Sequence, residues 1–472
     1  MWQAARPGAV LHYLGRLALV LGLATLVLPG AALLLGDRSL VAPYALLAGG
    51  LLGVGALARR WPAPPTLRRH EALVITALAF VLAPLVLALP FLRAGLGGVD
   101  AVFEAVSGVT TTGLSTAGPL AGRPPTFLFA RAWMQWLGGL GFVVFSLALL
   151  HTPAAAARQL GAPGVESGDV AASVRAHARR VLGAYVALSV LGIGLLCALG
   201  AGFFDAVVHA LAAVSTGGFA PRDDSLASLG PRLASGVLGL SLCGAIALPV
   251  QVGLWRGRWR SLGEDPESRA LVIAIALVAS WLLVCSDAGQ GVIDLVLLAV
   301  SAQSTAGFST SDPAALPAAG KAALILSMLS GGAQGSTAGG IKLLRVLMLL
   351  RLVQWLVEQT RLPSHAVSSP RFGGSALDAD ELLRAGAVVG LFLVVVALSW
   401  LAFLACGYAP LDALFEVVSA TGTVGLSVGI ARPELEPLLK GVLCADMYLG
   451  RLEIFALLVA LAPRTWLGRG GS

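Results

Sequence analysis

DAVFEAVSGVTTTGLST, at residues 100–116, has three counterparts that align with it without a gap. They are DAVVHALAAVSTGGFAP at residues 205–221, DLVLLAVSAQSTAGFST at 294–310 and DALFEVVSATGTVGLSV at 412–428. Each segment begins with an aspartate and reaches a glycine thirteen residues later, with a threonine two residues before that glycine. The glycines are Gly113, Gly218, Gly307 and Gly425, and the threonines are Thr111, Thr216, Thr305 and Thr423. Agreement at three fixed positions in four segments indicates an internal repeat.

Each repeated segment predicts a short helix followed by an irregular loop. An aspartate before an apolar run is a favoured helix N-cap, because its side chain accepts hydrogen bonds from the free N–H groups of the first turn. About eight apolar residues follow, too few for a bilayer crossing that needs roughly 20. The Ser/Thr/Gly stretch then ends the helix. Such backbone is tolerated at membrane depth only where protein buries it or where it lines a watery cavity.

The composition is that of a membrane protein. Hydrophobic residues make up 57% of the 472 positions and charged residues 12%, against about 25% charged residues in soluble domains. Apolar stretches predict ten spans, of which the eighth is interrupted by glycines and the first is a retained helix rather than a signal peptide. The spans are residues 14–36, 40–58, 72–92, 126–150, 181–202, 233–255, 270–288, 321–356, 385–406 and 438–462.

The distribution of lysine and arginine predicts that both termini are cytoplasmic. One side of the membrane collects 22 of these residues and the other side nine, with Arg451 inside the last span, and the more positive side is cytoplasmic. The 22 lie in the N-terminal end, in residues 59–69, 158–180, 256–269 and 342–384, and in the tail. Because these charges are spread over membrane-flanking loops, no nucleic-acid binding is expected. The five cysteines lie in apolar spans without C-x-x-C spacing and indicate neither a zinc site nor a disulfide framework.

The predicted fold is an all-α polytopic membrane protein in which four units of span, re-entrant helix, loop and span surround one axis with pseudo-fourfold symmetry. The units are residues 66–165, 166–265, 266–375 and 376–472, and residues 1–65 form an N-terminal two-helix extension. This arrangement places backbone carbonyls and threonine hydroxyls in rings that can replace the water around a cation. The C-terminal, partially negative ends of the short helices also favour a cation. The alternative is that the loops are glycine hinges in ordinary re-entrant loops of a transporter.

The four loops resemble the selectivity filters of the Trk/Ktr/HKT potassium transporter superfamily. The N-terminal pair of spans resembles the TrkH-type subunits of that superfamily. Three further stretches match it: QWLGGLGFVV at residues 135–144, GGAQGSTAGGIK at 331–342 and GRLEIF at 450–455. The resemblance implies a potassium pore formed by one chain in the bacterial inner membrane, a homodimer, and a cytosolic ring of nucleotide-binding regulatory subunits of the TrkA type as partner.

The resemblance also implies the residues of the filter, which would bind potassium and need no other bound cofactor. Gly113 in the first loop matches the potassium-preferring members, since sodium-favouring members have serine there. The loops read TTTG, STGG, STAG and GTVG, and this difference between them suggests fewer well-formed ion sites than four identical loops would give. The expected filter residues are Thr110, Thr111, Thr112, Gly113, Ser215, Thr216, Gly217, Gly218, Ser304, Thr305, Ala306, Gly307, Gly422, Thr423, Val424 and Gly425.

The glycine-rich run in the eighth span is the predicted gate. A phosphate-binding loop is disfavoured because the Gly-Lys-Ser/Thr ending is absent, whereas close helix packing remains an alternative. By resemblance, an intramembrane gating loop lies here, and Arg451 faces the pore below the filter. The alternative for this arginine is a salt bridge to Asp446 or Glu453. The expected gate residues are Gly331, Gly332, Gly335, Ser336, Thr337, Gly339, Gly340, Lys342 and Arg451.

Two carboxylates recur at one repeat position. Glu104 and Glu416 correspond to His209 and Leu298 in the other two repeats, which favours hydrogen bonding behind the loops over a ring of carboxylates. The histidines have no metal spacing and the chain has no catalytic arrangement, so an enzyme is not expected. We expect potassium uptake gated from the cytoplasm, with a potassium symporter coupled to protons or sodium as the alternative.

Overall fold

The computed structural model describes residues 4–62, 67–149, 170–286, 291–361, 370–372 and 375–467. In these ranges the regular secondary structure is helical except for a minimal antiparallel hairpin, in which β1 (Arg371–Phe372) pairs with β2 (Ser375–Ala376). Parts of the predicted basic segments at 158–180 and 342–384, and the boundary between the first two units, lie outside the described residues.

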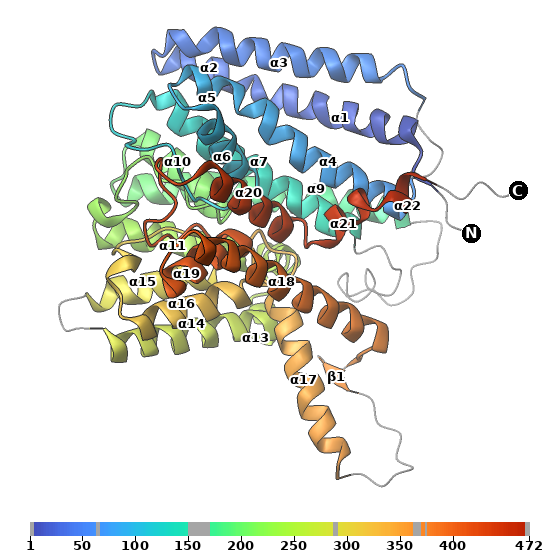
Figure 1. Cartoon of the computed structure of the whole chain (residues 1–472), viewed down its shortest axis with the longest axis vertical. Coiled ribbons are helices and arrows are strands. Elements are labelled where there is room, and N and C mark those ends of the chain that lie inside the picture. Colours follow the sequence, from blue (N-terminus) through green and yellow to red (C-terminus); the bar gives the residue numbers. More distant parts are fainter. Residues whose placement is uncertain are drawn as a thin grey trace, which may run out of the picture.

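The N-terminal extension is a helical hairpin at one edge of the molecule (Figure 1). It consists of α1 (Pro7–Thr25), α2 (Val27–Leu34) and α3 (Arg38–Ala58). α1 lies close against α3 because Gly15 and Gly55 carry no side chains at the crossing: a Cβ atom on Gly55 would lie 2.8 Å from the Gly15 carbonyl oxygen. The closest helix packing in the hairpin is therefore between α1 and α3 themselves.

Four repeats follow, and each contains one helix of twelve residues between longer helices. Repeat one has α4 (Arg69–Leu87), α5 (Leu89–Arg93), α6 (Gly98–Val109) and α7 (Pro125–Leu149). Repeat two has α9 (Val170–Ala198), α10 (Phe203–Val214), η1 (Ala227–Leu229), α11 (Pro231–Ala245), α12 (Leu248–Trp255) and α13 (Arg260–Glu264). Repeat three has α14 (Pro266–Cys285), α15 (Val292–Gln303), η2 (Pro313–Ala315), α16 (Ala318–Ser330) and α17 (Leu343–Gln359). Repeat four has α18 (Ala379–Ala405), α19 (Pro410–Thr421), α20 (Pro437–Arg451), α21 (Phe455–Leu461) and α22 (Pro463–Trp466).

The four short helices α6, α10, α15 and α19, called the repeat helices below, are the most deeply buried part of the fold. Every residue of α6 from Phe103 to Val109 is buried, and the same holds for α19 from Phe415 to Thr421. Each has twelve residues rather than the predicted eight or so, which is still too few to cross a bilayer. They enter the protein, end inside it and are surrounded by the longer helices.

The longer helices account for the predicted spans. Among the described residues, six helical segments are long and apolar enough to cross a membrane, and α11 with α12 forms a seventh if the bent pair is one span. The remaining predicted spans correspond to α7, to α16 with α17 and to α20 with α21. The chain is thus a multi-pass membrane protein.

The sequence predicts a break only in the eighth span, whereas the structure also breaks the sixth and the tenth. α11 and α12 are bent by 106° at their junction. Between α20 and α21, Glu453 and Ile454 have φ angles of 52° and 62°, which no helix accommodates. The prediction of continuous sixth and tenth spans is therefore wrong, and the break in the sixth span pairs with the interruption of the eighth through hydrogen bonds, as described below.

The prediction that the repeat aspartates are N-caps is also wrong. The N-cap positions hold Gly97, Gly202, Gly291 and Ala409, and each aspartate is the third residue of its helix. Three of these aspartates form ion pairs: Asp100 with Lys440 at 2.6 Å, Asp205 with Arg222 at 2.9 Å, and Asp412 with Lys321 at 2.7 Å. Two of the pairs join different repeats, so the repeated aspartate ties repeats together as well as complementing the helix dipole.

We expect Asp100→Asn to lower the free energy of unfolding by about 1–3 kcal/mol, because Lys440 would lose the charged acceptor of a largely buried hydrogen bond. The side chain of Lys440 is 5% exposed. The control is Asp294→Asn, since Asp294 holds the same repeat position without an ion pair among the described residues. Thermal unfolding of the purified proteins in detergent compares them, and equal losses would contradict the structural role of the Asp100–Lys440 pair.

Candidate functional site: a ring of four loops

The loops that follow the repeat helices close into a ring. These repeat loops are residues 110–113, 215–218, 304–307 and 422–425. A Cβ atom added to the glycine that ends one loop would lie within 3.0 Å of a carbonyl oxygen of the next: Gly113 against Gly217, Gly218 against Ala306, Gly307 against Val424, and Gly425 against Thr112. Because this series returns to the repeat in which it began, the four repeats surround one axis in chain order.

Glycine is required at these four positions for two reasons. The φ angles are 94°, 80°, 74° and 97° at Gly113, Gly218, Gly307 and Gly425, a region that other residues adopt only with strain. The neighbouring carbonyl also occupies the place that a side chain would take. The ring can therefore close at this radius only when all four positions lack a side chain.

The threonine of each repeat loop has a strained backbone. Its φ angle is 56° at Thr111, 51° at Thr216, 54° at Thr305 and 48° at Thr423, and a β-branched residue with positive φ is an outlier. The residue after the threonine donates its N–H to the carbonyl five positions earlier, as Thr112 does to Ser107 at 2.9 Å. This is a helix-ending hydrogen bond that normally accompanies glycine. The surrounding protein thus imposes a conformation that costs about 1–3 kcal/mol per residue.

The hydroxyls of the predicted filter residues differ in their hydrogen bonds. Those of Thr112, Thr216 and Thr305 have partners within the loops or in the segment at residues 331–342. Those of Thr110, Ser215 and Ser304 donate to the carbonyl one helical turn earlier, at 2.7, 2.9 and 2.7 Å, and so serve the helix ends. Those of Thr111 and Thr423 are buried without a hydrogen-bond partner among the described residues. A buried hydroxyl without a partner is costly unless a ligand or water supplies one.

Carboxylates hold the loops from behind, as the sequence predicts. Glu104 accepts hydrogen bonds from the N–H groups of Thr116 and Ala117, at 2.8 and 3.0 Å, and from Arg131 Nε at 3.0 Å. Glu416 accepts from Ser427 Oγ at 2.7 Å and from two backbone N–H groups of the following loop. Both carboxylates are fully buried. They fix the chain after the repeat loops and do not form an acidic ring.

Gln135 on α7 supports the loop of repeat two, a role that the sequence does not reveal. Its Nε2 donates to the Gly217 carbonyl oxygen, and its Oε1 accepts from the Phe219 N–H at 3.1 Å. Arg131 lies one turn earlier on α7, with its guanidinium 3.8 Å from the centre of the Phe219 ring. Repeat one therefore orients the loop of repeat two. The only signal is that Gln135 begins a stretch that matches a known family.

The glycine-rich loop, residues 331–342 between α16 and α17, lies at the base of the ring, where the repeat helices end. The Gly339 N–H donates to Thr305 Oγ1 at 2.7 Å, and the Gly340 N–H donates to the Gly422 carbonyl oxygen at 3.0 Å. Thr337 Oγ1 donates to the Val214 carbonyl oxygen at 3.0 Å. The loop thus contacts repeats two, three and four. Close packing is part of its role, since Gly339 has no room for a side chain beside Gly422.

The glycine-rich loop forms hydrogen bonds to the backbone at the break between α11 and α12. The Ala333 N–H donates to the Ala245 carbonyl oxygen at 3.1 Å, and the Leu248 N–H donates to the Gly335 carbonyl oxygen at 3.1 Å. Backbone groups freed from a helix inside a membrane need such partners. The break in the sixth span, which Pro249 marks in the sequence, therefore pairs with the interruption of the eighth span through these hydrogen bonds.

Two buried cations lie beside the glycine-rich loop. Arg451 Nη1 donates to the Thr337 carbonyl oxygen at 2.9 Å, and its guanidinium lies 4.1 Å from the centre of the Phe142 ring. Lys342 Nζ donates to the Ala338 carbonyl oxygen and lies 5.1 Å from the same ring. The exposed fractions of Arg451 and Lys342 are 1% and 2%. Both positive charges are therefore held in a low-dielectric place beside the base of the ring, where charges interact strongly.

The salt-bridge alternative for Arg451 is wrong within the described part of the chain. Glu453 pairs with Arg345, and Asp446 accepts a hydrogen bond from Ser399 Oγ at 2.6 Å. Nε and Nη2 of Arg451 have no hydrogen-bond partner among the described residues. The arginine is therefore held by the glycine-rich loop and by an aromatic face rather than by a carboxylate.

Known proteins match this chain over nearly its whole length. A family model described as TrkH, cation transport protein, matches residues 66–256 and 265–466. The Trk system potassium uptake protein TrkH of Halomonas elongata is 31% identical over 482 residues, covering 97% of this chain and 98% of that protein. TrkH of Escherichia coli K12 is 30% identical over 423 residues, covering 85% and 86%. An uncharacterized cation transporter of Methanocaldococcus jannaschii is 27% identical over 464 residues, covering 96% and 95%.

The fold also matches a solved structure. The crystal structure of the potassium transporter TrkH from Vibrio parahaemolyticus has a TM-score of 0.86 with this chain, at 25% sequence identity, and the match covers 98% of this chain and 99% of that one. The match confirms the predicted class of an all-α polytopic membrane protein.

We expect Gly425→Ala to destabilise the protein more than Gly429→Ala. Both glycines have positive φ, 97° and 89°, so both substitutions incur the left-handed strain of roughly 1–2 kcal/mol. Only at Gly425 would the new methyl group also displace a carbonyl oxygen, that of Thr112, because the space around Gly429 is open. Thermal unfolding in detergent measures the difference. Equal losses would mean that the ring is not closed as tightly as the backbone geometry indicates.

Proposed function

We propose that this chain, which belongs to the TrkH family of cation transport proteins, takes up potassium through the ring of repeat loops. Membership confirms the resemblance found in the sequence, and the relatives are transporters rather than enzymes. The observation that carries the proposal is the closed ring, in which each loop has a carbonyl oxygen beside the glycine of its neighbour. The relatives from Halomonas elongata and Escherichia coli are named as potassium uptake proteins, which supports potassium as the ion.

The chemistry of conduction follows from the backbone of the ring. Carbonyl oxygens replace the hydration shell of the ion, and the unpartnered hydroxyls of Thr111 and Thr423 add two acceptors. The four repeat helices end at the ring, where the negative ends of their dipoles favour a cation. A membrane potential supplies about 2.3 kcal/mol per charge per 100 mV, so inward flow needs no separate fuel. In this proposal the repeat loops are the selectivity filter, and Gly113 keeps the first loop in the potassium-preferring form.

The gate is the glycine-rich loop together with Arg451. The loop contacts the base of the ring in three repeats, and Arg451 holds it through the Thr337 carbonyl. Opening requires this loop to move. Its glycines disfavour a regular helix, so the loop can pack against the ring in a second arrangement. A regulatory partner can bias the loop only by making different contacts in the two states.

The proposed regulatory partner and the proposed homodimer rest on two exposed surfaces of the chain. Arg256, Arg258 and Arg260 are exposed on the side proposed as cytoplasmic, where a separate ring of nucleotide-binding subunits of the TrkA type can dock. α17 projects from the bundle (Figure 1) and exposes Leu350, Val353 and Val357 by 55–58%, an apolar surface suited to a second copy of the chain in a homodimer. Both termini are cytoplasmic, and the membrane is the bacterial inner membrane.

The experiment that tests the function is electrophysiology of the purified protein in liposomes. A channel-like pore gives currents that reverse near the potassium equilibrium potential. A symporter coupled to protons or sodium, the alternative function, gives a reversal potential that shifts with the second ion. A protein that conducts neither would contradict the proposal.

We expect Thr111→Val and Thr423→Val to weaken apparent potassium affinity about tenfold each, because each variant removes a hydroxyl acceptor worth roughly 1–2 kcal/mol. Valine keeps the shape, and neither hydroxyl has another partner among the described residues. Rubidium uptake into liposomes measures the effect. Ser309→Ala is the control, as it removes a hydroxyl just beyond a repeat loop. If Ser309→Ala weakened uptake as much, the register of the filter would be wrong.

Arg451→Ala should raise rubidium flux in the absence of any partner, by about tenfold or more, because the charged hydrogen bond that it removes is worth roughly 1.5–3 kcal/mol. Deleting residues 335–339 should act in the same direction by removing the loop from the base of the ring. Arg432→Ala is the matched control, because Arg432 is exposed and its nearest carboxylate lies 3.9 Å away. Flux at or below that of the unaltered protein in both variants would place the gate elsewhere.

A further inference from the structure

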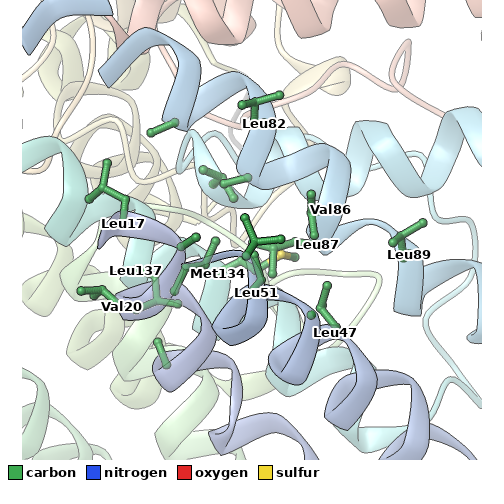
Figure 2. Close-up of a pocket in the computed structure, with 18 of the residues that line it drawn as sticks. Leu17, Val20, Leu47, Leu51, Leu82, Val86, Leu87, Leu89, Met134 and Leu137 are labelled. Atoms are coloured by element: carbon green, nitrogen blue, oxygen red, sulfur yellow. The ribbon is translucent and has the colours of Figure 1, made fainter. Parts of the chain in front are cut away.

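A large apolar cavity lies between the N-terminal hairpin and repeat one. Its volume is about 1480 Å³, above the roughly 300–1,000 Å³ of ordinary small-molecule pockets. Figure 2 shows that side chains of α1, α3, α4 and α7 point into it from opposite sides. Among the residues that line it are Leu17, Leu51, Val86, Met134 and Leu137. The cavity is separate from the ring of repeat loops, and the proposed potassium function does not use it.

The cavity exists because the hairpin is attached to the repeats at its two ends. At one end Arg6 and Glu71 form an ion pair at 2.8 Å. At the other end the Thr126 N–H donates to Asp37 Oδ2 at 2.8 Å. Between these polar attachments, α1 and α3 pack mainly on each other and leave an apolar space in front of α4 and α7.

The surroundings of the cavity identify its occupant. Its rim includes Val20, Leu46 and Val54, which are exposed by 63%, 77% and 61% and lie on helices that qualify as membrane spans, so they face hydrocarbon. Water is disfavoured, because a bound water needs two to four polar partners. The side chains in the lining that carry polar groups are those of Ser39, Trp61 and Arg93. Arg93 is the charged one; it is exposed and forms no ion pair within the described chain.

We propose that this cavity binds an anionic phospholipid, with its acyl chains between the hairpin and repeat one and its phosphate against Arg93. Arginine at a membrane surface attracts anionic head groups, and its planar guanidinium matches phosphate geometry. The apolar walls give the acyl chains a surface of the same chemistry as the bilayer interior.

The floor of the cavity connects the lipid to the ring. Val109, the last residue of α6, lines the cavity together with Met134 and Gly138. Gly138 lies directly against the Val109 carbonyl, and a Cβ atom on Gly108 would lie 3.2 Å from Met134 Cε. The residue after Val109 is Thr110, the first of the repeat loop. An acyl chain in the cavity therefore contacts Val109, the residue directly before the first repeat loop.

Lipid retention tests the proposal. Protein is taken from nanodiscs of phosphatidylethanolamine and phosphatidylglycerol into mild detergent, and native mass spectrometry counts the phospholipids that remain bound. Gly50→Trp should abolish retention, because Gly50 lines the cavity and has open space for a side chain. Gly49→Trp is the matched control, since Gly49 is on the same helix with equal space but outside the lining. Arg93→Gln should reduce the preference for phosphatidylglycerol about fivefold.

The proposal is overturned if the unaltered protein retains no phospholipid, or if Gly50→Trp and Gly49→Trp retain it equally. Should Gly50→Trp fail to fold, a phospholipid with a photoreactive acyl chain decides the matter on the unaltered protein. Cross-links to Met134, which is 2% exposed and lines the cavity, are expected. Cross-links confined to residues outside the lining would show an ordinary lipid boundary instead.

Discussion

The contact between a carbonyl oxygen of one repeat loop and the glycine of the next is the constraint on which the structure depends. Four such contacts bring four separate chain segments to one axis, and this requires the repeat helices to end near that axis. Helices that end inside the protein cannot cross the bilayer. Longer helices must therefore surround them and shield the polar backbone groups at their ends from lipid. The burial of the repeat helices, the positive φ angles of the four threonines and the glycines all follow from this convergence.

Much of this architecture can be predicted from the sequence, because Asp, Thr and Gly recur at fixed spacing and because apolar stretches of sufficient length mark most of the spans. The positions of the repeat loops and the interruption at residues 331–342 are local features of composition. The left-handed conformation of the four threonines cannot be predicted in this way. Threonine disfavours that conformation intrinsically, and only tertiary contacts impose it. The misplaced N-caps have a similar cause: a glycine or alanine holds each N-cap position, and two of the aspartates, Asp100 and Asp412, form ion pairs with distant segments.

Contacts between distant segments also explain the other features that the sequence could not reveal. Gln135 bonds to Gly217, 82 residues away, and Arg451 to Thr337, 114 residues away. Pro249, the second residue of α12, is a local signal for the bend between α11 and α12, because proline disfavours the interior of a helix. The local pattern does not show that a loop of another repeat supplies the hydrogen-bond partners at this bend. The sequence also does not show which residues pair with Asp446 and Glu453, the two carboxylates near Arg451. In the structure their partners are Ser399 and Arg345, which lie in other helices.

The four repeats share one ring but differ in their contacts with the glycine-rich loop. The glycine-rich loop contacts repeats two, three and four, and α11–α12 and α20–α21 are broken at the level where it lies. In repeat one α7 is continuous, carries the side chains that hold the loop of repeat two, and has the N-terminal hairpin and its cavity behind it. The hydrogen bonds of the glycine-rich loop thus join it to repeats two, three and four, whereas its contact with repeat one is that of Lys342 with the Phe142 ring on α7. Pseudo-fourfold symmetry is therefore kept at the ring of repeat loops, and the elements around the glycine-rich loop depart from it.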